Sequence, residues 1–267
     1  MITISNNNNS SDLLFSIPVH EKQDIVNNQI ENIFNFNPNC KIILHINESF
    51  LSFDINLSNY KNLFFNKSNI KYNRGGDLLA FHISNFNYCI NNNINFKFFI
   101  ITASNELFIK KGSIDYIKKY KNGLQIVKND NNDEWHNFNK NLKNNYNIKN
   151  LFQLINSNIL CGGQTEGQFF EKNIFKNIFY LYLKITNNND YLLEFEAEEI
   201  IPATIFNTLN LEYNNPITLQ NYSNNINFTI NYIKNLINNN LKIEDKTIKN
   251  QLYSPHINSD SENIYSI

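Results

Sequence analysis

Apolar and polar positions alternate in blocks along the first hundred residues. Apolar runs occupy 13–19, 41–46 and 96–102, and their β-branched and aromatic content predicts strands. The intervening segments 24–36 and 76–90 carry apolar residues at helical spacing. Strand, helix and strand in this order predict the right-handed parallel crossovers of an α/β fold.

The run at 96–102, F-K-F-F-I-I-T, is apolar enough to be buried on both faces, so we expect it at the centre of the sheet. Residues 70–72 predict a further extended segment. The polar stretch 130–147 predicts a long loop, and 171–183 and 198–209 predict two helices.

Composition predicts one folded domain over 12–267, preceded by a disordered polar segment, 1–11. The hydrophobic fraction of 42% is typical of a folded protein. A net charge of -1 gives no general attraction to nucleic acid or to an anionic membrane. There is no basic start followed by an apolar run, and no apolar stretch approaches the roughly twenty residues that span a bilayer. We therefore expect a cytoplasmic protein without an integral membrane segment.

The three cysteines, Cys40, Cys89 and Cys161, lack metal-site spacing and predict reduced core thiols. The chain has no D-x-D or H-E-x-x-H, and its five histidines lack ligand spacing, so no metal site is predicted. It also lacks a G-x-S-x-G elbow, a Walker loop and G-x-G-x-x-G, which disfavours hydrolases, P-loop proteins and simple dehydrogenases.

Polar residues follow each predicted strand of the first half. His20 follows the first run, Asn47 follows the second, and the segment 103–106 follows the third. Doubly wound sheets bind ligands beyond the carboxyl ends of their strands. These positions are therefore candidate edges of a site.

Glycine is scarce, and its clustering is informative. Four of the seven glycines form the doublets Gly75-Gly76 and Gly162-Gly163, and Arg74, the only arginine, precedes the first doublet. Such doublets serve either ordinary tight turns or a close approach of the backbone to a ligand.

The segment 194–204, E-F-E-A-E-E-I-I-P-A-T, combines four carboxylates with Pro202. Proline is tolerated in the first helical turn, which predicts a helix that begins near Glu198 or Glu199. The helix dipole would favour the ionised form of both acids, so one of them could serve as a base. A capping cluster on a solvated helix start is the alternative.

An ordered series of segments resembles the core-2/I-branching β-1,6-N-acetylglucosaminyltransferase family, including its bacterial and viral-type relatives and the xylosyltransferases. Order and approximate spacing agree over most of the chain. The matching segments are S-I-P-V-H-E (16–21), I-I-L-H-I-N (42–47), Y-N-R-G-G (72–76), F-F-I-I-T-A-S-N-E-L-F-I-K (98–110), G-G-Q-T-E-G-Q-F-F (162–170) and E-E-I-I-P-A-T (198–204).

The resemblance implies a GT-A-like fold, a Rossmann-type mixed sheet flanked by helices. It implies transfer of a sugar, GlcNAc or a related hexose or xylose, from a UDP-sugar to a glycan hydroxyl. Transfer would invert the anomeric centre and need no metal or cofactor. The position of the family's base is Glu199. The residues implied for the nucleotide-sugar are Val19, His20, Asn47, Arg74 and Gly75, and those for the acceptor are Glu106 and Glu166.

The chain departs from the family pattern at several positions. Pro202 replaces a tryptophan, Asn47 replaces an acid that faces the nucleotide, and Glu106 replaces an aspartate. The sequence ends at Ile267, just where the family pattern has a lysine for the diphosphate. Either the sequence is short of this position or another cation substitutes. The candidates are Lys242, Lys246, Lys249 and Arg74.

These departures leave a second interpretation open, a non-catalytic GT-A-like domain that binds a glycan or a partner. A methyltransferase-like enzyme is disfavoured because no glycine-rich loop follows the first predicted strand.

Overall fold

The computed structural model describes residues 12–47, 60–68, 70, 77–109, 111–128, 142–187, 193–219 and 254–255. The disorder expected for 1–11 therefore lies outside the described residues. So do Arg74, Gly75 and the candidate lysines near the end of the chain.

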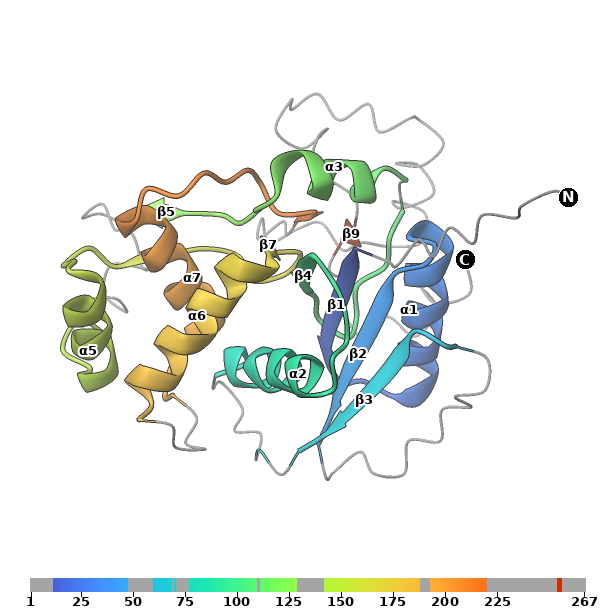
Figure 1. Ribbon diagram of the computed structural model, residues 1–267, viewed down its shortest axis with the longest axis horizontal. Helices are drawn as coiled ribbons and strands as arrows, with labels where there is room; N and C mark the ends of the chain where they lie inside the picture. The colour runs from blue at the N-terminus through green and yellow to red at the C-terminus, as the bar shows by residue number, and fades with distance from the viewer. Residues whose placement is uncertain are drawn as a thin grey trace, which may run out of the picture.

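The predicted crossovers are confirmed in the first half of the chain (Figure 1). The elements are β1 (Leu13–Pro18), α1 (Gln23–Phe36), β2 (Lys41–Ile46), α2 (Leu79–Asn91) and β4 (Phe98–Ile101). β1 pairs in parallel with β2 on one side and with β4 on the other. The periodicity of the sequence thus located these elements to within a few residues.

The central sheet has five strands in the order β3-β2-β1-β4-β7. β3 (Leu63–Lys67) runs parallel to β2, and β7 (Phe169–Glu171) runs antiparallel to β4. The expected central place of β4 is wrong, because β1 takes the middle position. β4 is nevertheless buried along its whole length, since β1 and β7 cover its two edges. The result is a mixed, mostly parallel sheet flanked by helices, compatible with a Rossmann-like fold.

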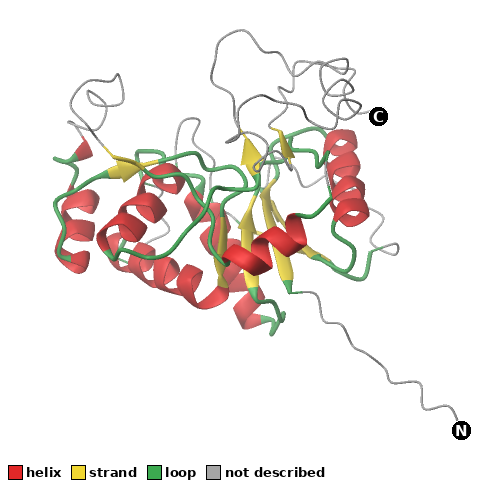
Figure 2. Cartoon of the chain, turned by 90° about the horizontal axis from the view of Figure 1, so that it is seen from above, coloured by secondary structure: helices red, strands yellow, loops and turns green. Residues whose placement is uncertain are grey.

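Helices cover both faces of the sheet (Figure 2). Successive side chains of a strand point to opposite faces. Phe15 and Ile17 accordingly pack with α1 in one apolar cluster. Leu14 packs on the other face, in the cluster that contains residues of α2, α6 (Lys172–Ile185) and α7 (Ala197–Thr208). A strand buried on both faces reads as a continuous apolar run, which is why β1 was recognisable in the sequence.

Aromatic rings fill the layer between the sheet and the helices α2 and α6. Phe99 of β4 lies with its ring centroid 5.4 Å from that of Phe86 and 4.2 Å from that of Phe175. All three side chains are fully buried. Burial of one such side chain contributes about 1.5–3 kcal/mol, so this layer holds α2 and α6 against the sheet.

The remaining elements are short and were not all predicted. They are α3 (Ser113–Tyr120), β5 (Val127–Lys128), α5 (Tyr146–Ile155), β6 (Cys161–Gly162), β8 (Thr218–Leu219) and β9 (Ser254–Pro255). α5 begins inside the stretch expected to be a loop, because the side chain of Asn145 caps it by accepting from the amides of Asn147 and Ile148. Ile70, expected to be extended, is not in a strand; the strand of this region, β3, comes earlier.

The three cysteines are buried free thiols, as predicted. In the part of the chain that the structure describes, no helix has the length and apolar character to cross a bilayer.

Candidate functional site

The strand order of the sheet reverses between β1 and β4. β2 and β3 extend the sheet to one side of β1, whereas β4 lies on its other side. The loops that leave the carboxyl ends of β1 and β4 therefore diverge, and such a switch point is where open α/β sheets bind ligands. Val19 and His20 follow β1 here, and residues 102–106 follow β4.

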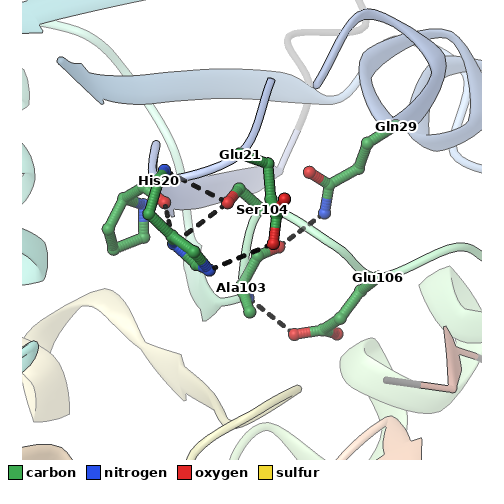
Figure 3. A network of polar contacts seen from close by, with 7 residues as sticks. His20, Glu21, Gln29, Ala103, Ser104 and Glu106 are labelled. Carbon is green, nitrogen blue, oxygen red and sulfur yellow. Dashed lines mark hydrogen bonds and ion pairs between the residues drawn. The ribbon is translucent and has the colours of Figure 1, made fainter. Parts of the chain in front are cut away.

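His20 and Ser104 join these two loops (Figure 3). Oγ of Ser104 lies 3.0 Å from Nδ1 of His20 and accepts from the backbone amide of His20 at 3.3 Å. Nε2 of the same ring lies 3.8 Å from Oε1 of Glu21. The ring is exposed, whereas Ser104 is fully buried. The buried hydroxyl thus holds the two loops together and leaves the imidazole at the edge.

Val19 and Asn47 are less available than expected. The side chain of Val19 is 5% exposed and belongs to the apolar core, and its amide donates to the carbonyl of His45 at 3.0 Å. Asn47 is partly buried after β2, and its Nδ2 donates to the carbonyl of Ile70 at 3.2 Å. Asn47 therefore connects the end of β2 to Ile70, beyond the end of β3, and its Oδ1 can accept from a hydroxyl.

Glu106 belongs to the loop after β4, and its side chain is buried. Its Oε1 accepts from the amide of Ala103 at 2.6 Å, and its Oε2 accepts from the hydroxyl of Thr218 at 2.7 Å. Nε2 of Gln29, on α1, donates to the carbonyl of Ala103 at 2.6 Å (Figure 3). Glu106 thus fixes the shape of this loop. Its side chain is only 1% exposed, so the carboxyl group does not reach the solvent.

Gly167 and Thr218 take part in the site although the sequence pattern did not single them out. Gly167 has a φ of 73°, and its amide donates to the carbonyl of Ile101 at the end of β4, at 2.9 Å. Its carbonyl accepts from the amide of Ile217 at 3.0 Å. A Cβ here would collide with Thr218, so glycine permits both the left-handed backbone and the close approach.

α7 begins at Ala197, slightly earlier than expected, so Pro202 lies in its second turn. A proline has no N–H to offer the carbonyl four residues before it, which is that of Glu198. Nε2 of Gln168 donates to this carbonyl instead, at 3.4 Å. The helix therefore tolerates Pro202 because a side chain of the neighbouring loop replaces the missing donor.

Glu199 is partly buried in the first turn of α7. Burial raises the pKa of its carboxyl to about 7, and repulsion from Glu166 and Glu196 acts in the same direction. The helix dipole favours the ionised form of Glu199, as expected for the start of a helix, whereas burial and the two like charges favour its neutral form. The structure brings Glu166 and Glu199 together.

A series of hydrogen bonds links Glu166, which lies near Glu199, to the loop at the carboxyl end of β4. Nε2 of Gln164 donates to the backbone carbonyls of Glu166 and Thr218, at 3.0 and 2.8 Å. Thr218 in turn donates to Glu106. The loop 163–168 therefore spans from the end of β4 to the start of α7, and its polar side chains carry both connections.

Among the residues described by the structure, no three or more His, Cys, Asp or Glu side chains are grouped to hold a metal ion.

The fold is that of an α/β protein with a mostly parallel sheet flanked by helices, compatible with a Rossmann-like fold. No protein-family model and no curated protein matches the sequence.

Proposed function

We propose that this protein is an inverting glycosyltransferase that moves GlcNAc or a related sugar from a UDP-sugar to a glycan hydroxyl. The observation that carries the proposal is the environment of Glu199. This carboxyl lies in the first turn of α7, partly buried, with its pKa raised to about 7. A general base works best when its pKa lies near the working pH. Glu199 is also the position that the resemblance assigns to the base.

The reaction is an in-line displacement at the anomeric carbon. Glu199 removes the proton of the acceptor hydroxyl as its oxygen bonds to that carbon, and the bond to the UDP oxygen breaks on the opposite face. General-base assistance of this kind contributes roughly 10²- to 10⁴-fold. Of the two residues assigned to the acceptor, Glu166 lies near Glu199, whereas Glu106 is buried.

The nucleotide-sugar is assigned to the carboxyl edge of the sheet. The exposed ring of His20 and the Oδ1 of Asn47 can meet the nucleoside there, with Val19 shaping the edge. Arg74 and Gly75 keep their assignment to the donor from the sequence. The departing UDP needs positive potential, for which Arg74, Lys242, Lys246 and Lys249 remain the candidates.

The proposal includes transfer without a divalent metal or other cofactor, since the chain lacks the D-x-D of metal-dependent transferases. It also places the protein in the cytoplasm, with a glycan acceptor and without a nucleic-acid partner.

One observation favours a non-catalytic, glycan-binding domain as the second candidate. Asn47 stands where the resemblance expects an acid, and its amide nitrogen is engaged with the chain itself. A protein of this kind would bind a glycan or nucleotide-sugar without turnover.

The test begins with a thermal-shift screen of UDP-GlcNAc, UDP-glucose, UDP-galactose and UDP-xylose, because a bound donor raises the melting temperature by mass action. Transfer is then measured with the donor that binds, with and without excess EDTA. We expect Glu199→Gln to lower kcat about 10²-fold or more with little change in donor affinity. Glu194→Gln, on an exposed residue of the same segment, is the matched control.

Donor binding without transfer would favour the second candidate. Activity that EDTA abolishes and manganese restores would contradict the metal-free mechanism. Full activity in Glu199→Gln would move the base elsewhere, with Glu166 the next residue to test.

A further inference from the structure

Two acids are buried where the starts of α2 and α7 meet. Asp77, just before α2, is 1% exposed, and Glu198, in the first turn of α7, is 3% exposed. Acids are almost never fully buried unless their oxygens have partners. The hydrogen-bond partners of Asp77 and Glu198 therefore show which parts of the chain these two acids hold together.

Glu198 joins the two helices directly. Its Oε2 accepts from the backbone amide of Leu78 at 3.0 Å. Leu78 stands at the start of α2, close in sequence after Arg74 and Gly75, the pair assigned to the donor. This single hydrogen bond thus connects the helix that carries Glu199 to the segment that follows the donor residues.

Asp77 gathers three further parts of the chain at the same junction. Its Oδ1 accepts from the amide of Ala80 at 3.0 Å and so caps α2. Its Oδ2 accepts from the hydroxyl of Tyr182, on α6, and from the amide of Leu193 at 3.1 Å. The junction is therefore held from α2, α6 and the segment that leads into α7.

The backbone of Glu198 is fixed as well as its side chain. Its carbonyl, left without a helical donor by Pro202, accepts from Gln168. Neighbouring residues of a helix point about 100° apart. Fixing both the side chain and the carbonyl of Glu198 therefore fixes the direction in which the neighbouring Glu199 leaves the helix. The carboxyl of Glu199 lies close enough to that of Glu166 for the two to repel each other.

We propose that Glu198 is a positioning residue, which holds Glu199 in place by clamping the first turn of α7 onto the start of α2. The inference rests on the proposed function. It adds to that function by giving the two neighbouring acids different roles, Glu199 as the base and Glu198 as the clamp.

The clamp requires an acceptor oxygen, which either form of the carboxyl supplies. Burial raises the pKa of Glu198 well above its ordinary range, and repulsion from Asp77 and Glu199 adds to the effect. Tyr182 is the third titratable group at the junction, and burial raises its pKa too. A neutral carboxyl and a carboxamide have nearly the same shape, and both present an oxygen that accepts from Leu78.

The experiment compares three variants in the full chain: Glu198→Gln, which keeps the acceptor oxygen, Glu198→Met, which keeps the volume but removes it, and Glu199→Gln. For each we would measure kcat, KM, donor Kd, the pH-rate profile and the melting temperature. We expect Glu198→Gln to retain kcat within about threefold and Glu198→Met to lose about 10- to 100-fold, as for a misplaced catalytic group. Donor Kd should change little in either variant.

With an active wild type, two results would overturn the inference while leaving the proposed function intact. One is full kcat with an unchanged pH profile in Glu198→Met, whatever its melting temperature. The other is a loss in Glu198→Gln as large as in Glu199→Gln. If Glu198→Met does not fold, Gln168→Met replaces it, since it removes the side-chain donor that holds the carbonyl of Glu198. An unchanged kcat in that variant would also overturn the inference. A wild type that transfers no sugar would instead overturn the proposed function, and this inference with it.

Discussion

The hydroxyl of Thr218 donates to the buried carboxylate of Glu106 across 2.7 Å. The two residues are far apart in the sequence, and their contact fastens the segment after α7 over the loop that follows β4. The acceptor is a buried carboxyl oxygen, and leaving such an acceptor without its donor costs about 1–3 kcal/mol.

Thr218→Val keeps the shape of the side chain and removes this donor. We expect the free energy of unfolding, measured by urea denaturation, to fall by about 1–3 kcal/mol. Thr208→Val is the matched control, because Thr208 donates to Ser157 in a partly exposed place and should cost less. Equal effects of the two variants would show that the contact with Glu106 has no special weight.

The pKa of Glu199 predicts how transfer depends on pH. Because the base must be ionised to act, kcat/KM should rise with pH through about 7. Burial is the largest cause of the raised pKa, and Glu166 and Glu196 add repulsion. Glu196→Gln removes one negative charge and should move the rise in kcat/KM to lower pH. Glu194→Gln serves as the control, and a rise that stays in place in Glu196→Gln would show that this carboxylate does not act on the base.

The pKa of Asp77 predicts a dependence of stability on pH. Burial raises this pKa from 3.8 to about 6, so the folded state holds a proton that the unfolded state releases earlier. The resulting stabilisation is fully present below about pH 4, falls as the pH rises and is lost above about 6. A pKa difference of this size between the folded and unfolded states corresponds to roughly 3 kcal/mol in the free energy of unfolding.

Asp77→Asn should flatten this decline in the free energy of unfolding between pH 4 and 7, measured by denaturant titration at each pH. Its overall stability should be lower, because one amide oxygen replaces two carboxylate oxygens that accept from Ala80, Leu193 and Tyr182. An unchanged slope would mean that other groups carry the pH dependence.

Local pattern was sufficient for the elements that form the frame of the sheet. β1, β2 and β4 are continuous apolar runs because helices cover both faces of a mostly parallel sheet. α1 shows the spacing of a helix buried on one side, whereas α2 is buried on most of its surface. The polar residues at the carboxyl ends of these strands, His20 among them, could be named for the same reason. β7 was missed because its three residues are too few to carry a periodicity.

The sequence by itself determined the order of the main strands and helices and the position of Glu199 at the start of a helix. Only the tertiary structure decided that β1 takes the centre of the sheet, because pairing partners are not encoded by periodicity. It also decided that Glu106 and Glu198 are buried and hydrogen-bonded while Glu199 stays partly exposed among like charges. Four carboxylates close together in sequence look alike as residues, and their pKa values and contacts depend on what the rest of the fold packs around each one.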